Sequence, residues 1–469
     1  MKSTKQRTVM SWLTALSLFA SLTGGIIVVD SRRALAEKPS KKADKVSSFL
    51  REQMRGKKTG ESVKAILQLD GQMSGQLNAL LRRNGVHHLR NLNTLTLDLS
   101  ADIIEQLAGF SEVSYVSFDA EVKSFGHVTE TTGTEAVRTQ KTTTLLGGTT
   151  TTTLDGTGIG IAVLDSGIDV QHTSFLDKSN GKRVVLSRDF TGENRTDDPY
   201  GHGTHVASTA AGNGRIANGA YTGLAPNAKI INLRVLNTRG AGTVSSVLGA
   251  LDWVLANRNA FNIRVVNLSL GMPAIDSYRN DPVCKAVRKL ADAGLVVVAA
   301  AGNNGKTSAG QKIYGAIHSP GIEPSALTVG ALNTYGTNSR SDDGVTSYSS
   351  RGPTRGFWKD SLGVKHYDNL LKPDLVAPGN KLVYAQAEDN LLVAQNPQLD
   401  ARVSGSDERK MMYLNGTSMS APVVAGAAAL MLQANPKLTP NMVKALLMYT
   451  AQPLAGFNTF EQGAGQLNV

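Results

Sequence analysis

Cysteine is nearly absent from this chain of 469 residues: Cys284 is the only one, so no disulfide can form within the chain. It stands in the helix-like stretch DPVCKAVRKLADAGL, where a small buried side chain is a better interpretation than a reactive thiol. Aromatic residues are also scarce, at 5%, whereas glycine is abundant, with 47 residues. This combination indicates an α/β fold in which helices pack closely on a sheet.

A concentrated patch of charge is missing as well. The formal net charge is +11, but the lysines and arginines are spread along the chain without a basic stripe or interleaved aromatic residues. We interpret this excess as a solvated surface and expect no nucleic-acid partner.

The N-terminus has the layout of a leader sequence. Cations in the first seven residues precede an apolar run over 12–29, and Ala34-Leu35-Ala36 fits the small-residue pattern of a cleavage site. We predict a signal peptide over 1–36 and a secreted, extracellular protein. The alternative is an uncleaved anchor helix, because the apolar run is long for a signal peptide.

A small domain is predicted next, within the segment 37–126. Residues 37–61 are rich in lysine and polar, and we expect them to be flexible, whereas residues 62–122 carry regular apolar patterns. The pattern predicts strand, helix, strand, strand, helix and strand at VKAILQL (63–69), 76–85, VHHLRNL (86–92), TLTLDL (94–99), 101–109 and VSYVSF (113–118). This order is typical of a small α+β ferredoxin-like sandwich.

The remaining segment, 127–469, contains two parts that differ in composition and in hydrophobic pattern. Threonine and glycine runs over 127–158 predict a linker or a surface arm, with a packed core from about residue 155. Short apolar runs then alternate with helical patterns, at 159–164, 228–236, 263–270, 295–301 and 326–332. Apolar strands separated by helices predict a parallel, doubly wound sheet with helices on both faces.

Four polar residues fall where these strands end or helices begin. Asp165 follows the first strand, Asn303 follows a later one, and His202 and Ser418 each open a helix. Taken singly, they are a turn former, a chain-turning amide, a structural histidine and a helix N-cap. Because strand ends of a parallel sheet meet at one edge, we expect the four side chains to gather there.

Together these groups make a nucleophilic site. A serine hydroxyl needs a base, so His202 would take the proton of Ser418, and Asp165 would orient and stabilise the imidazole. The amide of Asn303 and the backbone N–H of Ser418 would stabilise an oxyanion. Small residues after Ser418, in VVAGAAAL, would let its helix lie close to the sheet and fix the serine in place.

A metal site is the alternative use of the histidines. His202 and His205 are three residues apart and could share a zinc ion. No glutamate lies between them as a general base, and no third histidine or cysteine is placed to complete the site. We therefore predict no metal at this position and interpret His205 as structural.

The motifs AVLDSGID, GHGTHVAS, NLSLG, AAAGNNG and NGTSMSAP resemble those of the subtilisin-like serine proteases. GLAPNAKI, YSSRGPT and KPDLVAPG are similar to further stretches of that family, and the order Asp, His, Ser is the order of subtilisin. The resemblance covers 127–469 as a peptidase domain, and the segment before it resembles the inhibitory propeptide. It implies a serine endopeptidase with Asp165, His202 and Ser418 as the triad and Asn303 in the oxyanion hole.

The resemblance also implies where a substrate lies. Two extended segments would sandwich its backbone, and a third would form one wall of the pocket for the side chain before the scissile bond. They are Gly240, Ala241 and Gly242; Ser269, Leu270 and Gly271; and Ala300, Ala301 and Gly302.

Two departures from the family pattern concern ligands and specificity. Members with a strong calcium site carry an aspartate where this chain has Ser174, so we expect that site to be absent and no cofactor to be required, with calcium elsewhere left open. The loop KTSAGQKIYGAIHSPG is longer than usual beside the specificity pocket. His318 then lies either near the pocket floor or in an exposed loop.

The propeptide-like segment implies a zymogen. We expect it to assist folding, to block the cleft and to be removed by autoprocessing within 122–130, near His127. Polypeptides are the expected substrates of a monomeric enzyme, with no further C-terminal domain within these 469 residues. The alternative is a binding protein on the same fold that has lost catalysis, although serine, histidine and asparagine are all present.

Overall fold

The computed structural model describes residues 45–55, 61–82, 87–89, 94–118, 127–143 and 149–469. The chain divides into two compact units, Met1–Val122 and Lys123–Val469. The expected signal peptide over 1–36 lies outside the described residues.

The first unit has a four-stranded antiparallel sheet in the order β2-β3-β1-β4. Its elements are β1 (Ser62–Leu69), α3 (Gly75–Arg82), β2 (His87–Leu89), β3 (Thr94–Ser100), α4 (Ala101–Ala108) and β4 (Val113–Phe118). The expected order of strands and helices is therefore confirmed. One more helix, α2 (Ser48–Arg55), occupies part of the segment expected to be flexible, and its Leu50 is fully buried.

Alternation along β1 explains how this small core forms. Val63, Ala65 and Leu67 point to one face, where they cluster with Leu77 of α3 and Ile104 of α4. Lys64 and Gln68 point to the other face and are exposed. Because the strands have one apolar and one polar face, helices cover only the apolar face of the sheet.

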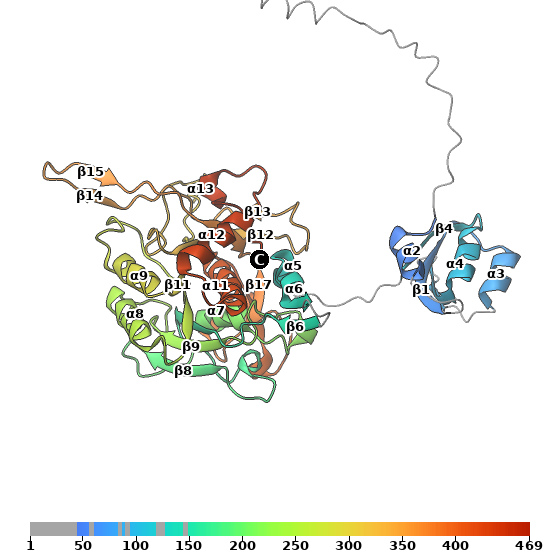
Figure 1. Cartoon of the computed structure of the whole chain (residues 1–469), viewed down its shortest axis with the longest axis horizontal. Coiled ribbons are helices and arrows are strands. Elements are labelled where there is room, and N and C mark those ends of the chain that lie inside the picture. The colour runs from blue at the N-terminus through green and yellow to red at the C-terminus, as the bar shows by residue number, and fades with distance from the viewer. Residues whose placement is uncertain (1–44, 56–60, 83–86, 90–93, 119–126, 144–148) are drawn as a thin grey trace, which may run out of the picture. The chain divides into compact units, whose positions relative to one another are not determined.

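The second unit is built on a sheet in the order β13-β12-β11-β10-β7-β9-β8, with β16 also paired to β12 (Figure 1). All these pairings are parallel except that of β13 with β12. The strands are β7 (Gly160–Asp165), β8 (Val184–Asp189), β9 (Lys229–Arg234), β10 (Ile263–Leu268), β11 (Val296–Ala300), β12 (Leu327–Asn333), β13 (Gly344–Val345) and β16 (Leu375–Pro378). The predicted mostly parallel α/β fold is confirmed.

Helices cover both faces of this sheet. Ile161 and Val163 of β7 belong to the same core cluster as α7 (His202–Ala211) and α11 (Thr417–Ala434). The alternate residues Ala162 and Leu164 belong to the cluster of α8 (Val244–Asn257) and α9 (Pro282–Asp292). A strand buried on both faces reads as a continuous apolar run, which is why the sequence carries so many of them.

Helix α11 packs unusually close to its neighbours. A Cβ atom on Gly426 would lie 2.4 Å from the Cβ of Leu224, and one on Gly379 would lie 2.2 Å from the Oγ of Ser420. By length and composition α11 could cross a membrane, but 78% of that stretch is buried inside this unit. It is the central helix of the core.

The threonine-rich segment differs from the expected linker or arm. It forms α5 (His127–Thr131), α6 (Thr134–Arg138) and the antiparallel pair β5 (Thr139–Thr143) and β6 (Thr149–Thr153). Val128 joins the main core cluster, and Thr129, Thr131 and Thr132 are buried. The packed core therefore starts well before residue 155.

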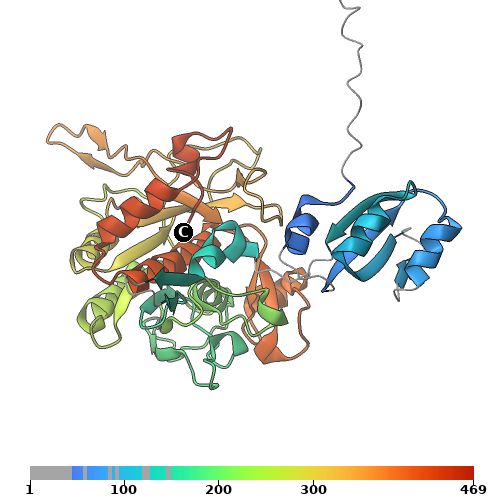
Figure 2. The same cartoon turned by 45° about the vertical axis from the view of Figure 1, so that its right-hand side comes forward.

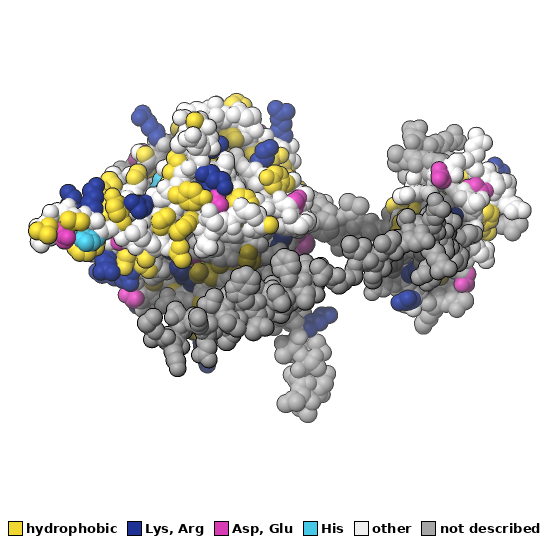
Figure 3. All heavy atoms as spheres, turned by 90° about the horizontal axis from the view of Figure 1, so that it is seen from above, with side chains coloured by type: hydrophobic (Ala, Val, Ile, Leu, Met, Phe, Trp, Pro, Cys, Tyr) yellow, Lys and Arg dark blue, Asp and Glu magenta, His cyan; other side chains and the backbone are white. Residues whose placement is uncertain are grey.

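A hairpin of β14 (Phe357–Lys359) and β15 (Lys365–Tyr367) projects from the second unit (Figures 1 and 2). Hydrophobic and basic side chains gather on this projection (Figure 3). Leu362, in the turn between the two strands, is 86% exposed. The remaining strands and α-helices are β17 (Leu382–Ala385) paired with β18 (Met411–Leu414), and α10 (Leu391–Gln395), α12 (Pro440–Thr450) and α13 (Thr459–Gln462).

Candidate active site

Asp165 and His202 are joined by a hydrogen bond. Asp165 is the last residue of β7 and is 1% exposed, and His202 is the first residue of α7. The Nδ1 atom of His202 lies 2.7 Å from Oδ1 of Asp165, so the carboxylate accepts the ring proton. Burial alone would lower the pKa of His202, but the negative charge and hydrogen bond of Asp165 outweigh it, and the pKa is raised above its usual value.

A second buried carboxylate, that of Asp198, is linked to this pair through Ser166 and the start of α7. Ser166 Oγ donates to Asp198 at 2.7 Å and also reaches Asp165 at 3.3 Å. Asp198 further accepts the backbone N–H groups of Gly201 at 2.8 Å and Thr204 at 2.7 Å, which fixes the start of α7. Its charge adds to the rise in the pKa of His202, while burial raises the pKa of Asp198 itself.

Ser418 lies in the first turn of α11 and is tied to the segment after β10. Its hydroxyl donates to the carbonyl of Ser269 at 3.0 Å, and the hydroxyl of Ser269 donates back to the Ser418 carbonyl at 2.6 Å. The structure therefore places the Ser418 hydroxyl on a backbone carbonyl and not on the ring of His202. A rotation about χ1 of Ser418 would be needed to aim it elsewhere.

Asn303 lies beside Ser418, two residues beyond the buried Ala301. Its Oδ1 accepts the backbone N–H of Thr417 at 2.9 Å and the Thr417 hydroxyl at 3.1 Å. The carbonyl end of the amide is therefore occupied, which leaves the NH₂ end as the free donor. Gly416 gives room on this side, because a Cβ there would lie 3.3 Å from Asn303 Nδ2.

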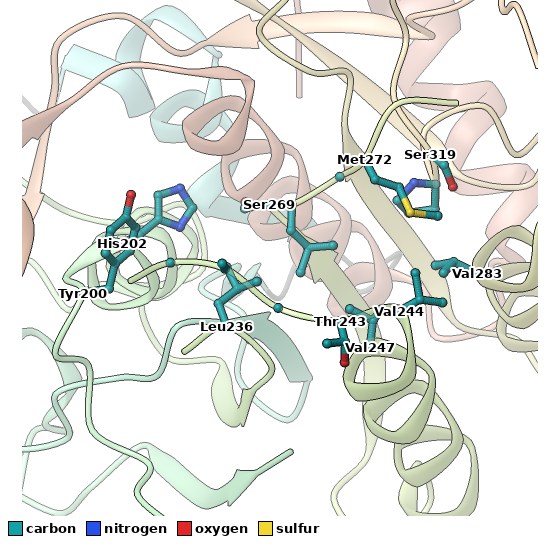
Figure 4. Close-up of a pocket in the computed structure, with 16 residues that line it drawn as sticks. Tyr200, His202, Leu236, Thr243, Val244, Val247, Ser269, Met272, Val283 and Ser319 are labelled. Carbon is teal, nitrogen blue, oxygen red and sulfur yellow. The ribbon is translucent and has the colours of Figure 1, made fainter. Parts of the chain in front are cut away.

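A cleft of about 420 Å³ runs between two of the predicted substrate segments (Figure 4). His202 and Tyr200 lie at one end, and Met272, Val283 and Ser319 lie at the other. Six of the predicted substrate residues line it: Gly240, Ala241, Gly242, Ser269, Leu270 and Gly271. An extended peptide could lie along such a groove and pair with the backbone on both sides.

A smaller pocket of about 220 Å³ adjoins Ser418. Ala300 and Gly302 line it together with Leu270, Gly271 and Asn303. Ala301 does not line it: its side chain packs into a buried cluster with Cys284, Ile317 and Ile322. His318 lines the pocket, so of the two positions open to it from the sequence, the structure places it at the pocket and not in an exposed loop.

The two histidines of the GHGTH motif point to different partners. His205 is fully buried, its Nε2 atom lies 3.0 Å from the carbonyl of Leu382, and its ring meets Tyr384 edge-on at 5.6 Å. Burial lowers the pKa of His205 to about 3, so the ring is neutral. Within the residues that the structure describes, no group of three His, Cys, Asp or Glu side chains could hold a metal ion.

Sequence reasoning missed the residues that hold the site in place: Ser166, Asp198, Thr417 and the hydroxyl of Ser269. Ser166 and Thr417 directly follow or precede a predicted site residue, and Asp198 stands four residues before His202. Their positions next to the predicted residues become informative only once the turn geometry is known. The sequence alone does not distinguish a carboxylate that supports the site from one exposed to solvent.

A histidine that lines a cleft and is hydrogen-bonded to a buried aspartate, together with a serine at a helix start and an amide donor beside it, is the arrangement used by serine-dependent hydrolases. The profile of the Subtilase family matches residues 156–466 of this chain. The chain belongs to the subtilase family of serine peptidases.

Individual relatives are similar over the same part of the chain. Serine protease AprX of Bacillus subtilis (strain 168) is 35% identical over 326 residues, which is 68% of this chain and 66% of AprX. Subtilisin DY of Bacillus licheniformis is 31% identical over 67% of this chain and 90% of its own length. The solved structure of Sphericase superposes with a TM-score of 0.51 at 27% identity and covers 67% of this chain and 92% of that one.

Proposed function

We propose that this protein is a secreted serine endopeptidase, made as a zymogen, that hydrolyses polypeptides through an acyl-enzyme on Ser418. One observation carries this proposal. His202, which is hydrogen-bonded to Asp165 at 2.7 Å, lines the same cleft as the segment Ser269–Gly271, and the carbonyl of Ser269 accepts the hydroxyl of Ser418. Membership of the subtilase family supports it.

The proposed reaction uses these groups in turn. The Ser418 hydroxyl rotates from the Ser269 carbonyl to Nε2 of His202, gives up its proton there, and its oxygen bonds to the substrate carbonyl carbon. The oxyanion that forms receives hydrogen bonds from Asn303 Nδ2 and the Ser418 backbone N–H. His202 then protonates the leaving amine as the C–N bond breaks, and water, activated by the same ring, releases the acid.

The hydroxyl bonded to Ser269 is the one observation that favours the alternative, a binding protein that has lost catalysis. The test is hydrolysis of casein together with labelling by a serine-directed fluorophosphonate. We expect wild-type protein to be labelled and active, Ser418→Ala to be neither, and a chelator to leave activity unchanged. Wild-type protein that folds but is neither labelled nor active would contradict the proposal and favour the alternative.

We propose that the first unit is a propeptide that assists folding and inhibits the cleft. Its sheet is covered by helices on one face, and on the other face Lys64, Gln68 and the 38% exposed Tyr115 are open to solvent. Autoprocessing would fall at or before the bond preceding His127, because Val128 and Thr129 lie buried in α5 and a protease cleaves extended backbone. N-terminal sequencing of the protein from the culture medium tests both this site and the export expected of a leader ending at Ala36.

We propose that folding requires no calcium and that the enzyme is a monomer. Arg183 is 5% exposed and donates to the backbone carbonyls of Ser174, Ala211 and Ala228 at 2.7–3.0 Å. The guanidinium of this chain's own arginine therefore already supplies positive charge to the carbonyls near Ser174. Arg183→Met should lower the free energy of unfolding by about 3 kcal/mol, since it leaves buried carbonyls without donors. A chelator should leave the melting temperature of wild-type protein unchanged. A chelator-induced drop would show that calcium binds elsewhere and would refute this proposal.

A further inference from the structure

The pocket beside Ser418 is lined by one imidazole, the side chain of His318. P1 is the substrate residue whose carbonyl is attacked. If Ser418 attacks the substrate as proposed above, the side chain of P1 must enter this pocket of about 220 Å³. Of the residues that line it, His318 is the single titratable one; the other contributions are Leu270, Gly271, Ala300, Gly302, Asn303, Asn304, Thr417 and Ser418.

The His318 ring crosses the space between the two backbone walls of the pocket. A Cβ on Gly302 would lie 2.9 Å from Cγ of His318, and a Cβ on Gly271 would lie 3.1 Å from its Cβ and 3.5 Å from its Nδ1. Both walls therefore need glycine where the ring passes. A side chain larger than that of glycine at either position would press on His318 and displace it, so the two glycines keep the place that the ring occupies.

The backbone of His318 is fixed from both sides as well. Its N–H donates to the carbonyl of Ala301 at 3.0 Å. Ser319, the next residue, exchanges two backbone hydrogen bonds of 2.9 Å with Met272. His318 is thus held by the same two segments that form the pocket walls, and its position is a property of the pocket.

The hydrogen bond of the ring decides which nitrogen carries the proton. Nε2 of His318 lies 2.8 Å from the NH₂ nitrogen of Asn304, which can only donate. Nε2 therefore accepts, and the neutral ring carries its proton on Nδ1, on the side of Gly271. Burial lowers the pKa of His318 below its usual value, which favours this neutral form.

A neutral N–H donor inside a pocket selects for an acceptor that carries no charge. A carboxylate brought into this site would lose its hydration and would meet a cation only if the buried ring of His318 took up a proton, whereas an amide oxygen would accept the proton of Nδ1 from the neutral ring at little cost. An aliphatic or aromatic side chain would bury the donor without a partner. We propose that His318 is a specificity-determining residue that makes this protease prefer glutamine or asparagine at P1.

The test is a set of peptides that differ at P1 alone, with Gln, Asn, Glu, Leu or Phe, cleaved by wild-type protein, His318→Gly and His318→Asn. For wild-type protein we expect kcat/KM for Gln to exceed that for Leu by about tenfold, the size of one neutral hydrogen bond. His318→Gly should lose this preference and gain at least tenfold for Phe relative to Gln. His318→Asn places an amide near the position of Nδ1 and should keep the preference for Gln.

Ratios between peptides cancel any loss of folded protein, and labelling of Ser418 by a fluorophosphonate reports the folded active fraction of each variant. Equal P1 profiles in wild-type protein and His318→Gly, with normal labelling, would overturn this inference and leave the proposed function standing. Wild-type protein that is not labelled and cleaves no peptide would overturn the proposed function itself, and this inference with it.

Discussion

The acid–base half of the site, Asp165 and His202, is held by buried charge, whereas the nucleophile half, Ser418 and Asn303, is held by neutral hydrogen bonds. Asp198 adds a second carboxylate to the first half. The second half relies on the carbonyl and hydroxyl of Ser269, and on the backbone N–H and hydroxyl of Thr417. We expect the first half to respond to pH and to charge removal, and the second to respond only to the loss of shape or of a donor.

The strongest test of this difference is Asp165→Asn. An amide at this position cannot hold the imidazole in the tautomer with its proton on Nδ1, so kcat should fall by about 10⁴-fold while substrate binding is kept. Steady-state kinetics on a peptide substrate measure this.

Asp169→Asn is the matched control for that variant. Asp169 lies four residues further along and accepts the backbone N–H of Gln171 without touching His202, so its loss should change kcat less than about twofold. If Asp165→Asn kept its activity, the acid–base half would not work through charge.

On the nucleophile side, Asn303→Leu tests a single neutral donor. It should lower kcat by about 100–1,000-fold with little change in KM, because the oxyanion exists only in the transition state; this magnitude comes from subtilisin, a member of the same family. The loss should be the same at every pH. A loss that varied with pH would show that the two halves are coupled more tightly than their contacts suggest.

The smallest effect is expected from Asp198→Asn. Activity requires neutral His202, so in wild-type protein kcat/KM should rise with pH through a pKa above 6.5. Removing the charge of Asp198 should lower the pKa of His202 and move this acidic limb to lower pH. An unmoved limb would mean that Asp198 is protonated in the folded enzyme.

The same pKa has a consequence for stability with the opposite sign. Because the folded state binds the His202 proton more tightly than the unfolded state, this group stabilises the fold below pH 6.5, and its contribution is lost as the pH rises through the raised pKa. Unfolding measured across this range in wild-type protein and Asp198→Asn should show a smaller pH dependence for the variant.

The sequence was most informative where local pattern and burial coincide. The alternation in β1 and the continuous apolar runs of β7, β10 and β11 predicted both sheets, and the polar residues at their ends predicted the members of the site. The geometry that holds those members could not be predicted, because it depends on contacts between distant segments. The pairs Ser418–Ser269 and Thr417–Asn303 are 149 and 114 residues apart in the chain.

Composition misled us where polar residues are buried by distant partners. Thr131 and Thr132 look like linker residues, yet the side chain of Gln466 and the backbone N–H of Val469 contact them. Arg183 shows the same dependence on distant partners, since it donates to the buried carbonyls of Ser174, Ala211 and Ala228. A buried polar residue is recognised by its partners, which the sequence does not name.

On its buried face, helix α11 approaches Leu224 and Gly379 so closely that Gly426 and Gly379 leave no space for larger side chains. A designer who wished to redirect this protein to other substrates should therefore leave Thr417–Ala434 alone and vary the loops that carry Gly240, Met272 and His318. Helix α11 would then present the Ser418 hydroxyl unchanged, while substitutions in these loops alter the side chains that a substrate meets.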